Sequence, residues 1–203
     1  MATEEAFTLT GKGFMELCYD RKWDDMIKFL STDEGSIPMQ EKKNIILFTD
    51  AIGNTPAHYA CRSGTGAGAG APDELMKEFL SIGGTDMLMK KDKYGRTPTH
   101  DACMHGAPLT LIKALTAEGG KVIVNLQDTN DGSSALHLAC ENIPKHGDSI
   151  VEVVKKLVSI GGEELLSTLN ESGKTAYDIA IHENSSEELQ KIIKPRESGC
   201  RCL

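Results

Sequence analysis

Gly95-Arg-Thr-Pro-Thr-His-Asp-Ala-Cys103 is the stretch that decides the fold, because three other segments of the chain align with it without gaps. Those segments are Gly53-Asn-Thr-Pro-Ala-His-Tyr-Ala-Cys61, Gly132-Ser-Ser-Ala-Leu-His-Leu-Ala-Cys140 and Gly173-Lys-Thr-Ala-Tyr-Asp-Ile-Ala-Ile181. A Gly-Gly pair follows the first three segments along the chain, and eight residues after its second glycine come Asp92, Asp128 and Asn170. Two markers that keep the same phase indicate an internal repeat.

The residues of one unit predict its local structure. Thr-Pro is typical of a helix start, because Thr caps free N–H groups and Pro fits the first helical position. A second helix follows, with apolar residues at helical spacing such as Leu75, Met76 and Phe79. The Gly-Gly pair is expected to end it, and an extended stretch then leads into an Asp-x-x-Gly turn. In one such stretch, Lys121-Val-Ile-Val-Asn125, the β-branched residues predict a short strand.

This pattern of turn, helix and helix resembles the ankyrin repeat, whose T-P-L-H-x-A signature matches the quoted segments. The resemblance covers residues 49–194, and residues 14–30 fit a degenerate first unit. It implies an all-α ankyrin-repeat solenoid of about five helix pairs with short hairpin-like turns and loop insertions. The expected divisions are 1–48 (N-terminal capping repeat and connection), 49–91, 92–127, 128–169 and 170–194 (four repeats) and 195–203 (a basic, Cys-containing tail).

The spacing of the turn glycines indicates insertions into the basic unit. Gly53, Gly95, Gly132 and Gly173 are 42, 37 and 41 residues apart, whereas an ankyrin unit has about 33 residues. Two insertions, residues 63–72 and 142–148, fall between paired helices. Insertions in a solenoid lie on one face, where binding is often individualised.

Composition excludes several other classes of protein. The chain has 203 residues, with 22 Lys and Arg against 30 Asp and Glu, a net charge of −8. An acidic chain is not expected to bind nucleic acid, which needs a positive surface. Eighteen consecutive apolar residues do not occur, the N-terminus does not resemble a signal peptide, and six cysteines without such a signal indicate reduced thiols. We therefore expect a cytoplasmic monomer without a cofactor.

Three histidines at the same repeat position suggest a metal site at first sight. His58, His100 and His137 belong to successive units, however, and packed helices lie about 8–10 Å apart. Zinc–nitrogen bonds are about 2.0–2.1 Å long, so these residues cannot share one ion. The resemblance implies a structural role for them, bonding across to a turn. Cys61, Cys103 and Cys140 also recur at one position, as small buried side chains do.

Two features leave an enzymatic alternative open. Asp101 and His105 are four residues apart on one predicted helix and could form a proton-transfer pair. The run Gly64–Gly70 superficially resembles a phosphate-binding loop, but it leaves a helix and lacks a following lysine. A flexible linker explains this run better, and we expect a protein that is not an enzyme.

The C-terminal tail suggests an alternative of another class, a lipid-anchored membrane adaptor. The residues Cys200-Arg201-Cys202-Leu203 fit the C-a-a-X prenylation pattern, although Arg201 and Cys202 are not the aliphatic residues that this motif prefers. Residues 191–203 hold four basic residues against Glu197, so the tail is positively charged while the rest of the chain is acidic. Prenylation of Cys200 beside basic residues would place the protein at the periphery of a membrane.

The leading prediction is a module that recognises another protein through the concave groove and the turn tips. Carried over from the repeat resemblance, the expected contact residues are Ile52, Asn54, Arg62, Lys93, Tyr94, Arg96, Met104, His105, Asn130, Ser133, Glu141 and Asn142. Tyr94, Arg96 and Met104 fall in one repeat and belong to residue types that are enriched at interfaces. We therefore expect the unit at 92–127 to be the centre of the binding surface.

Overall fold

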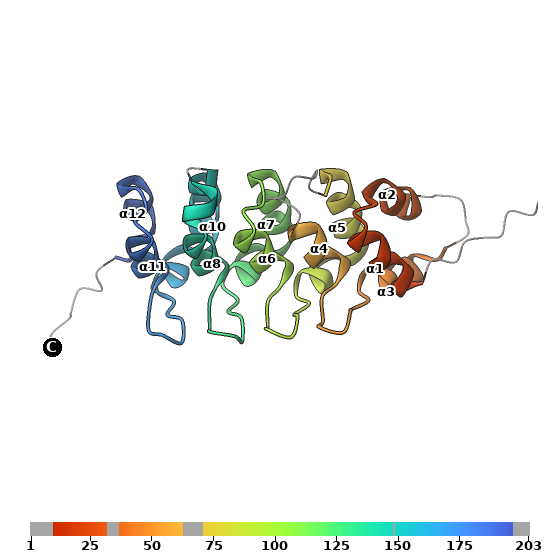
Figure 1. Ribbon diagram of the computed structural model, residues 1–203, viewed down its shortest axis with the longest axis horizontal. Coiled ribbons are helices and arrows are strands. Elements are labelled where there is room, and N and C mark those ends of the chain that lie inside the picture. Colours follow the sequence, from red (N-terminus) through yellow and green to blue (C-terminus); the bar gives the residue numbers. More distant parts are fainter. Residues whose placement is uncertain (1–9, 32–36, 63–70, 148, 197–203) are drawn as a thin grey trace, which may run out of the picture.

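The computed structural model describes residues 10–31, 37–62, 71–147 and 149–196, and these form an elongated row of helix pairs (Figure 1). The helices of the described residues are α1 (Gly11–Tyr19), α2 (Trp23–Ser31), α3 (Met39–Ile46), α4 (Pro56–Arg62), α5 (Asp73–Leu88), α6 (Pro98–Met104), α7 (Leu109–Val124), α8 (Ala135–Glu141), α9 (Ile143–His146), α10 (Ser149–Ser167), α11 (Ala176–His182) and α12 (Glu187–Ile193).

The helices lie in two rows that run the length of the molecule. In the inner row α1, α4, α6, α8 and α11 contact one another in turn, and in the outer row α2, α5, α7, α10 and α12 do the same. The predicted all-α solenoid of about five helix pairs is therefore confirmed. The described residues contain no strand, and only a single β-bridge joins Gln127 to Ser134.

In three units the second helix is interrupted at its Gly-Gly pair, as predicted, but a further helical segment follows, so the extended stretch expected there is wrong. Gly120 has φ 56° and ψ −145°, which kinks α7, but the chain resumes helical structure as far as Val124. Gly84 in α5 and Gly162 in α10 do the same. The strand predicted at residues 121–125 is also wrong, because the extra helical turn buries Ile123 and Val124 in the core.

Two short helices had not been predicted. Helix α3 lies in the N-terminal connection, where it buries Ile45 and Ile46 and contacts α1 and α5. Helix α9 lies in the second insertion, between α8 and α10. Both therefore occupy segments in which the repeat pattern gives no signal.

The turns before the inner helices form a stack of their own. Asp92 Oδ1 accepts hydrogen bonds from the backbone N–H groups of Tyr94 (2.8 Å) and Arg96 (2.9 Å), which fixes the shape of its turn. Neighbouring turns are then joined by backbone bonds, as between the Thr129 N–H and the Tyr94 carbonyl (2.8 Å). Gly95 has φ +76°, and a Cβ there would lie 2.5 Å from Thr129 N. Residues displayed by these turns thus project from a firmly joined backbone.

Candidate functional site

The candidate site lies on the surface that α4, α6, α8 and α11 form with the turns before them, which we call the inner face. Three histidines help to hold this face together. His100 Nδ1 accepts the Thr97 N–H (3.2 Å), which leaves the proton on Nε2 to be donated to the Leu126 carbonyl (3.1 Å). His58 and His137 make the equivalent bonds to the carbonyls of Arg96 and Lys174.

His58 and His137 therefore connect one unit to the next, and His100 bonds to the segment of its own unit that leads into the next turn, in the structural role that the resemblance implies. Burial lowers the pKa of His58 and of His100 to about 4, so both rings are neutral at pH 7. Across residues 10–31, 37–62, 71–147 and 149–196, no three His, Cys, Asp or Glu side chains are grouped so that they could hold a metal ion. The side chains of Cys61, Cys103 and Cys140 are buried, and burial raises the pKa of Cys103 to about 12. Their thiols are accordingly protonated and unreactive at neutral pH.

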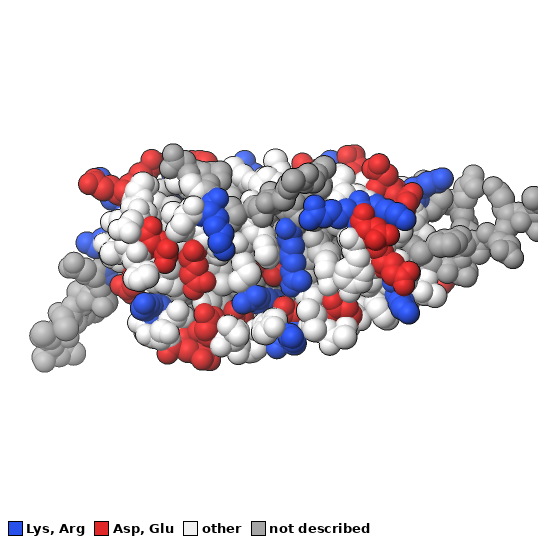
Figure 2. All heavy atoms as spheres, viewed as in Figure 1, with Lys and Arg blue, Asp and Glu red and all other residues white. Residues whose placement is uncertain are grey.

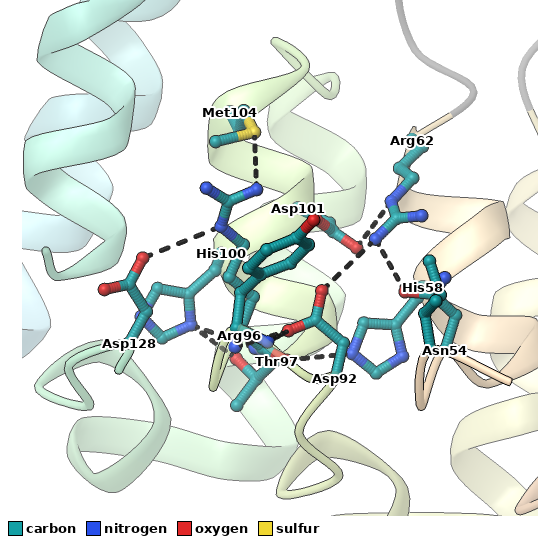
Figure 3. Close-up of polar contacts among 12 residues, drawn as sticks. Asn54, His58, Arg62, Asp92, Arg96, Thr97, His100, Asp101, Met104 and Asp128 are labelled. Carbon is teal, nitrogen blue, oxygen red and sulfur yellow. Dashed lines mark hydrogen bonds and ion pairs between the residues drawn. The ribbon is translucent and has the colours of Figure 1, made fainter. Parts of the chain in front are cut away.

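Arg62 is the centre of a polar network (Figure 3). Its Nε donates to Asp101 Oδ2 (2.8 Å) and its Nη2 to Asn54 Oδ1 (2.7 Å), while Asp92 Oδ2 lies 3.6 Å from Nη2. Asp101 is fully buried, and this burial raises its pKa to about 6 although Arg62 opposes the shift. Because the Asp101 carboxylate is held by Arg62, its position argues against the proton-transfer pair suggested for Asp101 and His105.

Tyr94, Arg96 and Met104 come together as a second cluster, which we call the Tyr94 cluster. Figure 3 shows its Arg96 and Met104 side chains in contact. The Tyr94 ring is 38% exposed, with Lys93 Nζ 4.7 Å and Arg96 Cζ 5.2 Å from its centroid. Arg96 Nη1 lies 3.6 Å from Met104 Sδ, and Arg96 Nε lies 3.6 Å from Asp128 Oδ2. The cluster thus presents an aromatic ring between two cations on the inner face.

The remaining predicted contact residues divide by burial. Asn54, Ser133 and Asn142 are at most 5% exposed, so we omit them from the contact surface. Asn54 instead joins Arg62 to the turn, and Asn142 Nδ2 donates to the Leu138 carbonyl at the end of α8. The other residues reach solvent wholly or in part: Ile52, Arg62, Lys93, His105, Asn130 and Glu141.

Further inner-face residues were missed by the sequence analysis. Tyr59 donates a hydrogen bond to Asp50 Oδ2 (2.7 Å), and its ring packs edge-on against that of Tyr19 at 5.0 Å. Asp131 was missed as well, whereas Asp128 had been noted only as a turn marker. The register could have placed Tyr59, since it occupies the position in its unit that Asp101 occupies in the next.

Charge is unevenly distributed over the molecule. On the face shown in Figure 2, blue side chains cross the middle of the solenoid, while red ones gather toward its two ends. In the C-terminal half, the carboxyl group of Glu141 has a pKa that is raised by burial and by Asp131 and Asp128. The inner face therefore changes from cationic and aromatic at Tyr94 to acidic at Glu141.

Some predicted features lie outside the described residues or concern membranes. Cys200, the C-a-a-X pattern and the glycines of Gly64–Gly70 fall outside the described ranges. In the part of the chain that the structure describes, no helix combines the length and the apolar character that crossing a bilayer requires.

Comparison with known proteins identifies the repeat. A family model described as "Ankyrin repeats (3 copies)" matches residues 66–164. The chain is 30% identical over 165 residues to human SMC5-SMC6 complex localization factor protein 1, which covers 81% of this chain and 14% of that protein. It is 31% identical over 118 residues to human transient receptor potential cation channel subfamily A member 1, covering 58% and 9% of the two chains.

A third relative is the mouse serine/threonine-protein kinase TNNI3K, 34% identical over 89 residues, or 43% of this chain and 10% of the kinase. The chain thus spans about a seventh or less of the length of these relatives. Their names describe proteins of different kinds, so the likeness identifies a shared repeat and not a shared activity.

Proposed function

This chain is an ankyrin-repeat protein, and we propose that it is a non-catalytic module that binds another protein through its inner face. Ankyrin repeats generally mediate protein–protein interaction, and solenoids offer extended surfaces for this purpose. One relative is named as a localization factor of a protein complex, which is in keeping with such a role.

The observation that carries this proposal is the Tyr94 cluster. Tyrosine, arginine and methionine are residue types enriched at interfaces, and tyrosine and arginine supply much of the binding energy there. Here the Tyr94 ring is exposed and held between Lys93 and Arg96, so little order has to be gained on binding. The cluster sits on turns that are joined to their neighbours by backbone hydrogen bonds.

The enzymatic alternative has less support. The Asp101 carboxylate is engaged by Arg62, and the histidines that recur at one position are engaged in hydrogen bonds to backbone carbonyls. A thermal-shift screen with nucleotides and divalent metal ions tests this alternative. We expect no change of midpoint, and a clear stabilisation by any of these ligands would revive it.

The proposal is tested by replacing Tyr94, Arg96 and Met104 together with alanine. We expect this variant to lose capture of the partner in affinity purification with mass spectrometry, while its circular dichroism spectrum is unchanged. A matched control replaces Met89, Val122 and Lys113, three exposed residues outside the cluster, with alanine and should keep full capture. Retained capture by the first variant would show that the binding surface lies elsewhere.

We propose that the protein is a cytoplasmic monomer. The second hypothesis is that a lipid on its C-terminal tail anchors it to a membrane. It rests on the sequence Cys200-Arg201-Cys202-Leu203 and on the basic residues before it. Intact mass spectrometry of the protein from a eukaryotic cell decides between the two forms. Addition of a prenyl mass at Cys200, abolished in Cys200→Ser, supports anchoring, and an unmodified tail excludes it.

A further inference from the structure

Two positions of each unit meet across the inner face, and their chemistry changes along the solenoid. They are the residue directly after the turn glycine and the residue nine positions after that glycine. We compare the units at 49–91, 92–127 and 128–169. In the first Asn54 accepts a hydrogen bond from Arg62 (2.7 Å), and in the second Arg96 contacts Met104 (3.6 Å). The third unit has Ser133 and Glu141 at these positions.

The third unit is left without the partners that the first two have. Ser133 is too short to bridge as Asn54 and Arg96 do, and its Oγ is buried without a hydrogen-bond partner among the described residues. None of the hydrogen bonds or ion pairs between described residues involves the Glu141 carboxylate. Within the ranges that the structure describes, Ser133 and Glu141 therefore lack a side-chain hydrogen bond of the kind that joins Asn54 to Arg62 in the first unit.

Asp128 and Asp131 add further acceptors next to Glu141, and we call these three residues the Glu141 cluster. Asp128 is 95% buried: its Oδ1 accepts backbone N–H groups of the turn, but its Oδ2 has no hydrogen-bond partner among the described residues. The nearest cation to Oδ2 is Arg96, whose Nε is 3.6 Å away. Figure 3 shows the Asp128 side chain pointing from its turn toward Arg96 on the inner face.

The balance of charge in the cluster favours a cation as its ligand. Arg96 lies beside Asp128 and opposes the effect of the carboxylates on Glu141, but Asp131, Asp128 and Glu183 act together against it, so the charge around Glu141 is mainly negative. Each neighbouring carboxylate, together with burial, raises the pKa of Glu141, and Glu183 contributes in the same direction. Unpaired acceptors that are partly removed from water gain most from a charged hydrogen-bond donor.

We propose that the Glu141 cluster receives an arginine or lysine side chain of the protein that binds the inner face. This inference rests on the proposed function and names the partner's chemistry: a basic residue placed one repeat away from the segment that covers Tyr94. The net charge of −8 acts in the same direction, because it attracts a basic segment over a longer range.

The test selects peptide ligands directly on the inner face and does not require the identity of the partner. A phage-displayed library of random 16-residue peptides is panned against the full chain, and selected peptides are measured by fluorescence anisotropy. We expect them to share one Arg or Lys whose replacement by Gln weakens binding about tenfold. Glu141→Gln should weaken the parent peptide equally, and it should add no further loss to the Gln-substituted peptide.

The control is Glu118→Gln, the same chemical change at an exposed position on α7, which should leave binding unchanged. Glu141→Lys should instead select peptides with Asp or Glu at the shared position. Peptides that bind through Tyr94 and Met104 but are insensitive to Glu141→Gln would overturn this inference and leave the proposed function standing. Failure to select any peptide would count against both proposals.

Discussion

Arg62 and Arg96 lie on the same face of the solenoid and each lies over a tyrosine ring, yet their guanidinium groups differ in the hydrogen bonds they make. Arg62 donates to two acceptors at 2.7–2.8 Å and holds the buried carboxylate of Asp101. Arg96 approaches an aspartate only to 3.6 Å, has a sulfur atom as its hydrogen-bond acceptor, and stacks on an exposed ring. Its Nε has no hydrogen-bond partner among the described residues.

The difference indicates that Arg62 serves mainly the stability of the fold, whereas Arg96 serves mainly the recognition of a partner. Arg62 makes short hydrogen bonds to a buried aspartate and a buried asparagine, so removing it leaves the Asp101 carboxylate buried without its partner. Arg96 makes no hydrogen bond shorter than 3.6 Å to a side chain of the described residues and stacks on the exposed Tyr94 ring, so it contributes to a surface that a ligand can reach. Neighbouring units thus share a backbone plan, while their arginines differ in how tightly they are hydrogen-bonded to buried groups.

The strongest test of this comparison removes each arginine in turn. Arg62→Ala leaves the Asp101 carboxylate buried without its partner, and we expect a loss of about 3–4 kcal/mol in the free energy of unfolding. Arg96→Ala should cost only about 1 kcal/mol, because Asp128 keeps its backbone hydrogen bonds. Urea unfolding followed by circular dichroism measures both, and equal losses would contradict the division.

The pH dependence of stability separates the groups around Arg62. His58 and His100 have lowered pKa values of about 4, so the fold favours their neutral forms. Their contribution to the free energy of unfolding is complete above pH 6.5 and is lost as the pH falls toward 4. Asp101 has a raised pKa of about 6, so its contribution is largest below its ordinary pKa and is lost as the pH rises through 6. Two histidines outweigh one aspartate, and we expect a net loss of about 3 kcal/mol between pH 7 and 4.5.

Asp101→Asn provides the matched variant for this pH series. In the wild type, protonation of Asp101 adds stability as the pH falls, and the variant lacks this addition. Its urea midpoint should therefore fall more steeply than that of the wild type between pH 7 and 4.5. Parallel curves for the two proteins would show that the pKa of Asp101 is not raised.

The next test weakens the turn that carries Tyr94 and Arg96. Gly95→Ala places a Cβ 2.5 Å from Thr129 N at a φ of +76°, so we expect a loss of about 2 kcal/mol in stability. Gly173→Ala has a similar φ of +69° but nothing within 4 Å of its Cβ, and about 1 kcal/mol is expected. Thermal unfolding compares them, and the excess at Gly95 measures how tightly neighbouring turns are stacked.

The repeat plan could be predicted from sequence because its signals act over short distances. Thr97 and His100 are three residues apart and close a capping box, and Gly95 adopts the positive φ that its turn requires. The continuation of α7 past Gly120 could not be predicted in the same way. The kink permits either a strand or a new helical turn, and the burial of Ile123 and Val124 decides between them.

The candidate site was predicted in part for a related reason. Tyr94, Arg96 and Met104 belong to one unit, so the repeat register was enough to bring them together. The partner of Asp101 is Arg62, 39 residues earlier and at a different position of its own unit. Such a pair depends on side-chain directions between stacked helices, which a register of equivalent positions does not contain. Sequence spacing alone pairs Asp101 with the nearby His105 and does not reveal its contact with Arg62.

The smallest expected effect on stability concerns Glu141, in the unit that follows the one carrying Arg96. Because burial and neighbouring carboxylates raise its pKa, the ionised form destabilises the fold as the pH rises, and a neutral side chain should relieve this. We expect Glu141→Gln to increase the free energy of unfolding at pH 7 by about 0.5 kcal/mol, a value kept small because the carboxyl group is partly solvated. The gain should vanish near pH 4, where Glu141 is protonated, and Glu118→Gln should show no gain at either pH. A residue whose removal stabilises the protein but weakens a ligand is maintained for binding and not for folding. A loss of stability in Glu141→Gln at pH 7 would instead place Glu141 with Arg62, among the groups that hold the solenoid together.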